Sequence, residues 1–193
     1  MSRKKLTASL FLDYIINLVL TGLGFIALSW MFAFSRGNFL HSVIFTLTLF
    51  GFIYSKGALA AKIDLRSEKA PMKNAFMLAL PLTVTLLFVI GVYSLIYYNI
   101  LPIGDIVLGT SSSEAGETFS FLFKDAASMV VRVLFLNLTG FMKTNLATPL
   151  VLLISPLCVM LGALFGYLLG RKKIYLLDIM LKAKDKIANK FNE

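Results

Sequence analysis

The chain has 193 residues, a formal net charge of +9 and a hydrophobic fraction of 58%. Soluble domains are about 45–50% apolar and about 25% charged, whereas charged residues here make up only 15% and the mean hydropathy is +0.82. These values exclude a disordered chain, which needs low hydrophobicity. The single cysteine excludes a disulfide-stapled mini-protein. The composition therefore predicts a single membrane domain over residues 1–193.

Four apolar stretches are long enough to cross a bilayer, which takes a helix of about 20 residues. They predict membrane spans at about 14–35, 38–61, 75–101 and 146–170. Helices are expected because backbone polar groups cannot stay unpaired in lipid, and these runs do not alternate as barrel strands do. The predicted fold class is all-α: a polytopic bundle of four membrane helices, with an outer amphipathic helix and a basic C-terminal helix.

The basic residues predict the orientation of the spans. Fifteen of the nineteen lysines and arginines lie in the N-terminal segment, in the loop between spans two and three, and in the tail 171–193. Four spans put these segments on one side, which the positive-inside rule makes cytoplasmic. We expect a multi-pass protein of the cell membrane, of bacterial type, with both termini in the cytoplasm. A cleaved signal peptide is the weaker alternative for span one, because its apolar run exceeds the usual length of about 7–15 residues.

The outer loop at 103–145 is much longer than an ordinary connection. Its segment 119–142 is apolar, yet its polar side chains fall on one helical face, which predicts an amphipathic helix. Thr118 or Ser120 is the expected N-cap. The helix is expected to seal the bundle or to lie in the outer interface; its functional interpretation is a lid or a partner-binding element. Whether 133–142 enters the membrane stays open, because the pattern is lost there.

Span four holds Gly162, Gly166 and Gly170, one glycine at every fourth position. At this spacing the glycines form a groove that another helix backbone can approach closely. We expect helix packing within the monomer, with contacts between copies as the alternative. The expected partner face on span two consists of Gly51, Ser55 and Ala58.

Two prolines, Pro149 and Pro156, also lie in span four, and a proline inside a helix removes a backbone donor and bends it. The bend is either static or a hinge for gating. Asp13 and Lys56 lie at the predicted cytoplasmic edges of spans one and two. They are a candidate ion pair at the inner mouth of a pathway; the preferred interpretation is that each side chain reaches the headgroups by itself.

Arg171, Lys172 and Lys173 begin the basic tail. The tail is expected to continue span four as a helix and then to lie on the inner leaflet, where anionic lipids attract each basic residue by about 1 kcal/mol. Docking to a cytoplasmic protein is the alternative. Nucleic acid is not an expected partner, because the membrane topology already accounts for the charge.

Residues that carry chemistry are sparse. His41 is the only histidine and Cys158 the only cysteine, whereas a metal site needs several such ligands. We expect no metal, no cofactor and no enzymatic activity. The absence of buried charge and of catalytic residues favours an accessory or scaffold subunit that acts through helix–helix contacts with a membrane protein or with its own copies. The alternative is a small transporter or channel, gated by the kinked fourth span and the outer amphipathic segment.

Overall fold

The structure, a computed structural model, describes residues 3–27, 35–66, 72–112, 118–142 and 148–173. Its elements are α1 (Arg3–Ala27), α2 (Ser35–Arg66), α3 (Lys73–Tyr97), η2 (Pro102–Asp105), β1 (Val107–Ser112), β2 (Thr118–Leu122), α4 (Phe123–Leu134), η3 (Leu136–Phe141), α5 (Pro149–Leu152) and α6 (Ile154–Arg171). Four stretches of helix in this described part are long and apolar enough to cross a membrane: Lys5–Ala27, Asn38–Leu65, Lys73–Tyr97 and Pro149–Arg171. The predicted all-α membrane fold is therefore confirmed, while the predicted C-terminal helix lies outside the described residues.

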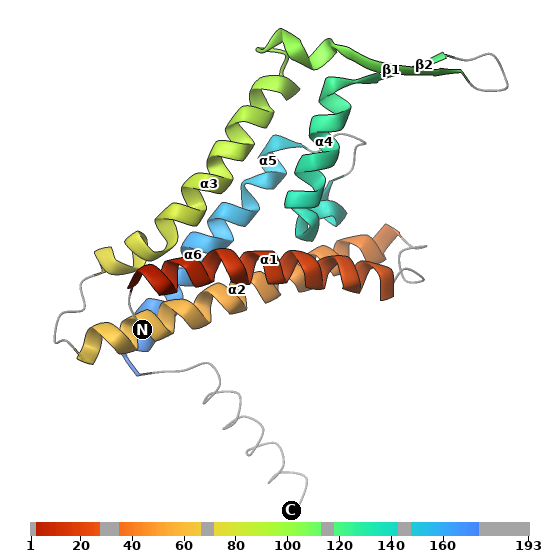
Figure 1. Cartoon of the computed structure of the whole chain (residues 1–193). Helices are drawn as coiled ribbons and strands as arrows, with labels where there is room; N and C mark the ends of the chain where they lie inside the picture. Colours follow the sequence, from red (N-terminus) through yellow and green to blue (C-terminus); the bar gives the residue numbers. More distant parts are fainter. Residues whose placement is uncertain (1–2, 28–34, 67–71, 113–117, 143–147, 174–193) are drawn as a thin grey trace, which may run out of the picture.

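The long helices approach one another at one end of the molecule and separate toward the other (Figure 1). The first end carries Lys5, Lys62, Lys73 and Arg171, all exposed, and is called the basic end below. The opposite end carries the strands β1 and β2 and is called the strand end. From the strands, α4 runs toward the α1–α2 pair (Figure 1).

Two helix boundaries differ from the predicted ones in a way that matters for the site. The helix α1 already begins at Arg3, whereas the predicted span begins at 14. The helix α2 continues to Arg66, beyond the predicted end at 61. Charged residues were expected to stop both spans, but a helix accommodates a charge where a partner or the surrounding water stabilises it. The residues 28–34, which complete the predicted first span, lie outside the described part.

The outer segment starts as a small sheet instead of a helix. Residues 118–122, expected to open the amphipathic helix, form β2, which pairs antiparallel with β1 and joins Gly109 with Phe121 and Ser112 with Thr118. In this stretch Thr118 and Ser120 alternate with phenylalanines, and such alternation of residues with high strand propensity favours a strand. The expected caps Thr118 and Ser120 are thus wrong.

The helix α4 begins only at Phe123, where the Asp125 carboxylate accepts a hydrogen bond of 3.0 Å from the Leu122 amide. An ion pair of 3.2 Å between Lys124 and Asp105 joins the start of α4 to η2. The amide of Phe123 also donates to the Ile106 carbonyl at 2.9 Å. The first turn of α4 is therefore fixed at the strand end.

Candidate functional site

The segment formed by α4 and η3, residues 123–141, runs from the strands to the α1–α2 pair and turns along α2 there (Figure 1); we call it the re-entrant segment. The Tyr14 hydroxyl, near the middle of α1, donates a hydrogen bond of 2.9 Å to the Leu134 carbonyl at the last turn of α4. The chain then turns back along α2. Asn137 lies against Thr46, with two contacts of 3.4 Å, and the Gly140 amide donates to the Ser42 hydroxyl at 2.7 Å.

The contacts of η3 with α2 fix the direction in which the chain runs there. From Asn137 to Gly140 the partner on α2 changes from Thr46 to Ser42, which is toward the start of α2 and away from the basic end. The backbone of 136–141 is thus a 3-10 helix at the depth of the first turns of a candidate membrane span. The structure thereby places 133–142 beside the spans, the position that the sequence left open.

One glycine makes this close approach feasible. A Cβ atom at Gly140 would overlap the Asn38 carbonyl group of α2. Glycine has no Cβ and therefore allows two backbones to touch. The sequence alone does not single out Gly140, because a single glycine occurs in a loop for many reasons other than a close backbone contact.

The helix α4 presents its polar side to the bundle and its apolar side outward. Ser128 is 2% exposed, whereas Val133 is 65% exposed. A helix that merely sealed the bundle from water would bury its apolar side. The observed orientation is the one expected where lipid surrounds the helix, because the hydrocarbon then solvates the apolar side chains.

The half of the α1–α2 pair that receives the re-entrant segment has a polar inner surface. On α1 the buried residues change from leucines at 6 and 10 to Asn17 and Thr21; on α2 the sequence of buried residues runs from His41, Ser42 and Thr46 to Leu49 and Ile53. Tyr14, Ser42 and Thr46 pair with the backbone or side chains of the re-entrant segment, as described above. The His41 ring nitrogen Nε2 donates to the Thr21 carbonyl at 3.2 Å, and His41 packs between Phe25 and Phe45. This contact accounts for the histidine without catalysis.

Some buried polar atoms have no hydrogen-bond partner among the described residues. Asn17 is 0% exposed, and neither its side-chain nitrogen nor its side-chain oxygen is paired. The hydroxyl of Thr83 on α3 is also buried and unpaired. Such atoms are rare in proteins, and each calls for an explanation such as a bound water or ligand.

The fourth span is broken near the level of Ser155. α5 ends at Leu152, Leu153 forms a turn, and α6 begins at Ile154. Pro156 has no amide hydrogen and cannot bond to the Leu152 carbonyl, which explains the break one turn before the proline. The interruption is confined to Leu153, whose φ of −62° and ψ of −17° stay in the α-helical region; a bend or hinge at Pro156 stays a prediction.

Asp13 and Lys56 come together between α1 and α2, with 3.4 Å between Oδ2 and Nζ and side-chain exposures of 15% and 24%. Asp13 lies about 12 Å along α1 from Lys5, at about 1.5 Å per residue. The pair is therefore inside the helical stretch, whereas the sequence placed it at the edge. The preferred interpretation, in which each residue reaches the headgroups by itself, differs from this pairing.

The three glycines of α6 face α2 of the same chain. Cβ atoms would meet Ile53 at Gly162, the Tyr54 backbone at Gly166 and Ala58 at Gly170. Successive glycines meet successive turns of α2, so the two helices run parallel. The expected partner face is partly wrong: Gly51 has nothing within 4 Å and Ser55 is exposed, while Ala58 does take part. The groove meets Phe50, Ile53, Tyr54, Ala58 and Ala61, and Gly57 in turn meets Ala163.

The basic end contains a cluster that the sequence analysis missed. Asp64 is 3% exposed, and its Oδ2 accepts hydrogen bonds of 2.8 Å from both the Asn74 amide and the Tyr167 hydroxyl. These residues join α2, α3 and α6. The signal available in the sequence was the helical spacing that continues past 61.

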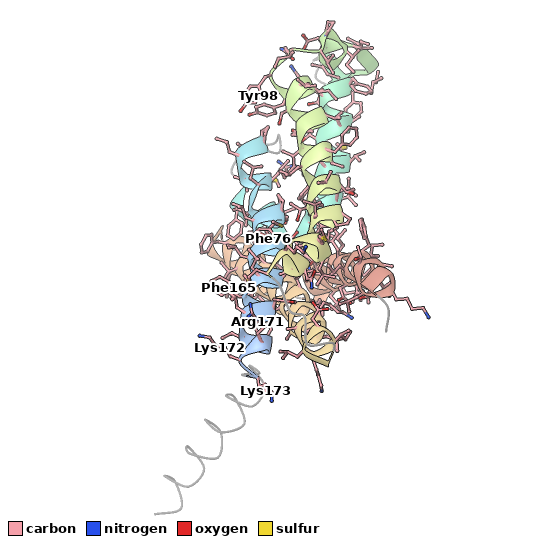
Figure 2. All side chains as sticks on the ribbon, turned by 90° about the vertical axis from the view of Figure 1, so that its left-hand side faces the viewer. Phe76, Tyr98, Phe165, Arg171, Lys172 and Lys173 are labelled. Atoms are coloured by element: carbon pink, nitrogen blue, oxygen red, sulfur yellow. The ribbon has the colours of Figure 1, made fainter. Side chains whose placement is uncertain are left out.

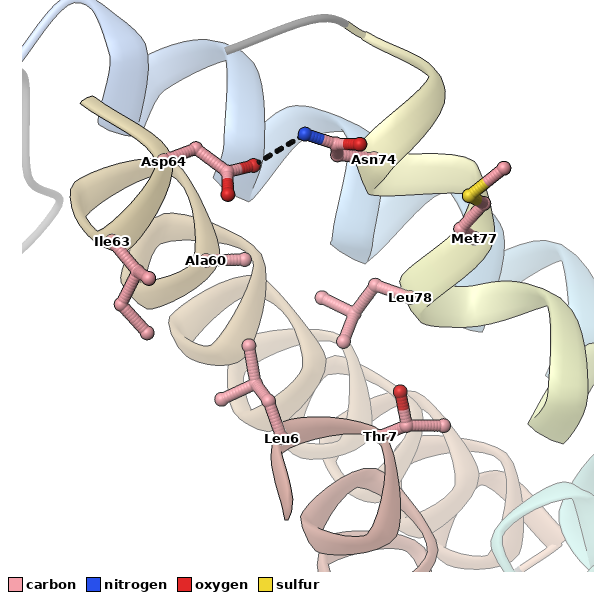
Figure 3. A pocket seen from close by; sticks show the side chains of 8 residues that line it. All are labelled: Leu6, Thr7, Ala60, Ile63, Asp64, Asn74, Met77 and Leu78. Atoms are coloured by element: carbon pink, nitrogen blue, oxygen red, sulfur yellow. Dashed lines mark hydrogen bonds between the residues drawn. The ribbon is translucent and has the colours of Figure 1, made fainter. Parts of the chain in front are cut away.

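A pocket of about 80 Å³ lies beside this cluster. In Figure 3, Asp64 and Asn74 lie at one side of the pocket and Leu6 and Thr7 at the other. Its lining consists of Leu6, Thr7, Ala60, Ile63, Asp64, Asn74, Met77 and Leu78. Only three of these side chains are polar, so the pocket suits a mainly apolar occupant.

Arg171, Lys172 and Lys173 are exposed at the end of α6, far from Tyr98 at the end of α3 (Figure 2). The rest of the predicted basic tail lies outside the described residues. Among the residues that the structure describes, no three His, Cys, Asp or Glu residues are grouped so that they could hold a metal ion.

Comparisons with known proteins give no relative from which a function can be transferred: no family model, no curated protein and no solved structure matches the chain. The chain is thus characterised by its architecture: a helical protein whose described part has four helices long and apolar enough to cross a membrane and one segment, α4 with η3, that packs against the α1–α2 pair.

Proposed function

We propose that the chain is a small membrane transporter or channel, and that the re-entrant segment forms the middle of its pathway. The observation that carries this proposal is the contact of 2.9 Å between Tyr14 and the Leu134 carbonyl. Through it, backbone that leaves the helical hydrogen-bond pattern reaches the middle of a candidate span. Such backbone is tolerated at membrane depth only where protein buries it or where it borders a water-filled cavity.

Buried polar side chains at several depths support a pathway. Asp64 and Asn74 lie at the basic end, Thr83 and Asn17 farther along their helices, and His41 near the start of α2. Polar residues inside membrane proteins are costly, and they commonly mark a path for ions or solutes.

The broken fourth span supports a pathway that opens and closes. The turn at Leu153 interrupts the helix beside Ser155. Discontinuous spans near the middle of the membrane are a recurring feature of transporters. Movement of α5 relative to α6 would change the space next to the re-entrant segment.

The accessory or scaffold subunit remains the second candidate. α1 favours it, since the candidate span Lys5–Ala27 has only 22% of its most apolar window buried, whereas the other three have 39–44%. Lipid or a partner helix can cover this surface. The absence of buried charge, which favoured a scaffold when only the sequence was considered, supports it less, because Asp64 is buried and Asp13 is mostly buried.

The two candidates are separated by purification in mild detergent, followed by reconstitution into vesicles. The proposal expects permeability to small solutes above that of protein-free vesicles, measured by light scattering after an osmotic step. Recovery of a membrane protein partner in a fixed ratio, together with vesicles as tight as the protein-free control, would instead establish the scaffold function. Either function leaves the chain without an enzymatic role.

The proposed orientation puts the basic end in the cytoplasm, with Arg171, Lys172 and Lys173 next to anionic lipid. In a Cys158→Ser background, Lys173→Cys should react with a membrane-impermeant thiol reagent only after the cells are opened. Ile100→Cys, which is exposed beyond α3 at the strand end, should react in intact cells. The reverse pattern would contradict the orientation.

A further inference from the structure

We propose that the Asn17 side chain binds an uncharged solute group that both donates and accepts hydrogen bonds, such as a hydroxyl, an amide or water, in the middle of the pathway. This inference rests on the proposed transport function. Asn17 has no assigned structural role in the bundle: its amide does not pair with the re-entrant segment, with α2 or with its own helix.

The position of Asn17 follows from its neighbours on α1. One turn before it, Tyr14 bonds to Leu134. Just over one turn after it, Gly22 faces the Leu136 side chain, with 3.5 Å to a Cβ built at that glycine. Along the axis of α1, Asn17 lies between these two positions, on the buried face of Tyr14 and away from that of Gly22, so it is level with the tip of the re-entrant segment.

The chemistry of the group is read from the atoms that lack partners. A side-chain amide has donors on its nitrogen and an acceptor on its oxygen, and at Asn17 both sides are unpaired although the residue is fully buried. A cation would satisfy the oxygen alone, and an anion would satisfy the nitrogen alone. A hydroxyl, an amide or a water molecule satisfies both.

A second group lies close by on another helix. The Ser155 hydroxyl is buried, and it is a hydrogen-bonding neighbour of the Tyr14 hydroxyl. The Tyr14 oxygen donates its hydrogen to Leu134 and keeps the ability to accept one. Asn17 and Ser155 thus offer donors and acceptors from α1 and from the broken span, and neither carries a charge.

The Thr21 hydroxyl shows how a polar side chain of α1 is satisfied when its role is structural. It donates a hydrogen bond of 2.6 Å to the Asn17 backbone carbonyl, within the same helix. The Asn17 side chain makes no comparable bond. The difference is the physical basis for separating a ligand-binding role from a structural one.

The experiment uses the variant Asn17→Leu in the full-length protein, purified and reconstituted. Leucine has a similar size and no polar atoms, and replacing an unpaired buried polar group by such a residue is neutral or stabilising. We expect the permeability to water, glycerol and urea to fall at least tenfold while the Tm stays the same or rises. The matched control is Thr85→Val, since Thr85 is exposed on α3 and its hydroxyl bonds only to the Pro81 carbonyl of its own helix; it should leave both readouts unchanged.

Permeability equal to that of the unsubstituted chain in Asn17→Leu would overturn the inference, and so would a fall in Tm together with the loss of permeability, since that combination identifies a structural residue. If the permeability of Asn17→Leu falls for glycerol and urea but not for water, the group that Asn17 binds belongs to an organic solute. If the permeability falls for water alone, the group is water itself. Unsubstituted vesicles as tight as the protein-free control contradict the proposed function instead. Binding by Asn17 is then decided by whether glycerol raises the Tm of the unsubstituted chain more than that of Asn17→Leu, and an equal shift in both overturns it.

Discussion

The interface between α2 and α6 and the interface between α2 and the re-entrant segment use the same helix in different ways. Along its second half, α2 meets the glycines of α6 through close backbone packing, and only near its end does a polar pair, Asp64 with Tyr167, join the two helices. Along its first half, α2 meets 136–141 through Ser42 and Thr46. Regular helices need only close packing in lipid, whereas irregular backbone needs side chains that complete its hydrogen bonds. The first interface thus serves stability, and the second holds the segment to which we assign the pathway.

The largest expected effect is at the helix–helix interface. In Gly166→Leu the new side chain overlaps the Tyr54 backbone, so α2 and α6 must separate, at a cost of about 3 kcal/mol or more, above the usual range for overpacking. Unfolding in detergent with increasing denaturant measures this loss. Gly51→Leu is the control, because nothing lies within 4 Å of a Cβ at that position; equal stability of the two variants would contradict the close packing.

A smaller effect is expected where the re-entrant segment touches α2. In Gly140→Ala a single methyl group collides with the Asn38 carbonyl, and we expect a loss of about 1–3 kcal/mol and a larger relative loss of vesicle permeability. Gly91→Ala, which meets nothing within 4 Å, is the control. If Gly140→Ala lowered stability without any change in permeability, the second interface would be structural like the first.

The ion pair lies between the two interfaces and tests whether charge matters there. Lys56→Met leaves Asp13 without its partner inside the helical stretch, and we expect a loss of about 1–3 kcal/mol, between the values for surface and for buried pairs. The double variant Asp13→Leu with Lys56→Met should recover part of that loss. Independent, additive effects of the two substitutions in a double-mutant cycle would show that the pair contributes nothing.

The smallest expected effect is the loss of one hydrogen bond at the tip of the re-entrant segment. Tyr14→Phe removes the donor to the Leu134 carbonyl and should cost about 1 kcal/mol. Hydrogen exchange of the last turn of α4 should become faster. Tyr98→Phe, on an exposed tyrosine at the strand end, serves as the comparison and should leave exchange in α4 unaltered.

Much of the fold could be predicted from the order of the residues. Charge-free apolar runs of bilayer width predict four long helices, and glycine at every fourth position predicts a surface for close packing. The positions of Asp13 and Lys56 could also be read from the sequence. Their pairing could not, because it depends on how α1, which begins at Arg3, packs against α2.

The sequence by itself determined that the chain is a helical membrane protein, because the length and hydropathy of a span are local properties that need no knowledge of its neighbours. Only the tertiary structure decided that residues 123–141 turn back inside the bundle, that α4 directs its polar side inward, and that Asp64 joins Asn74 and Tyr167. These features depend on which backbone groups and side chains meet across residues far apart in the chain, such as the 98 positions between Ser42 and Gly140. The hydrophobic pattern of a short segment is the same whether its polar side chains face water, a partner backbone or a solute.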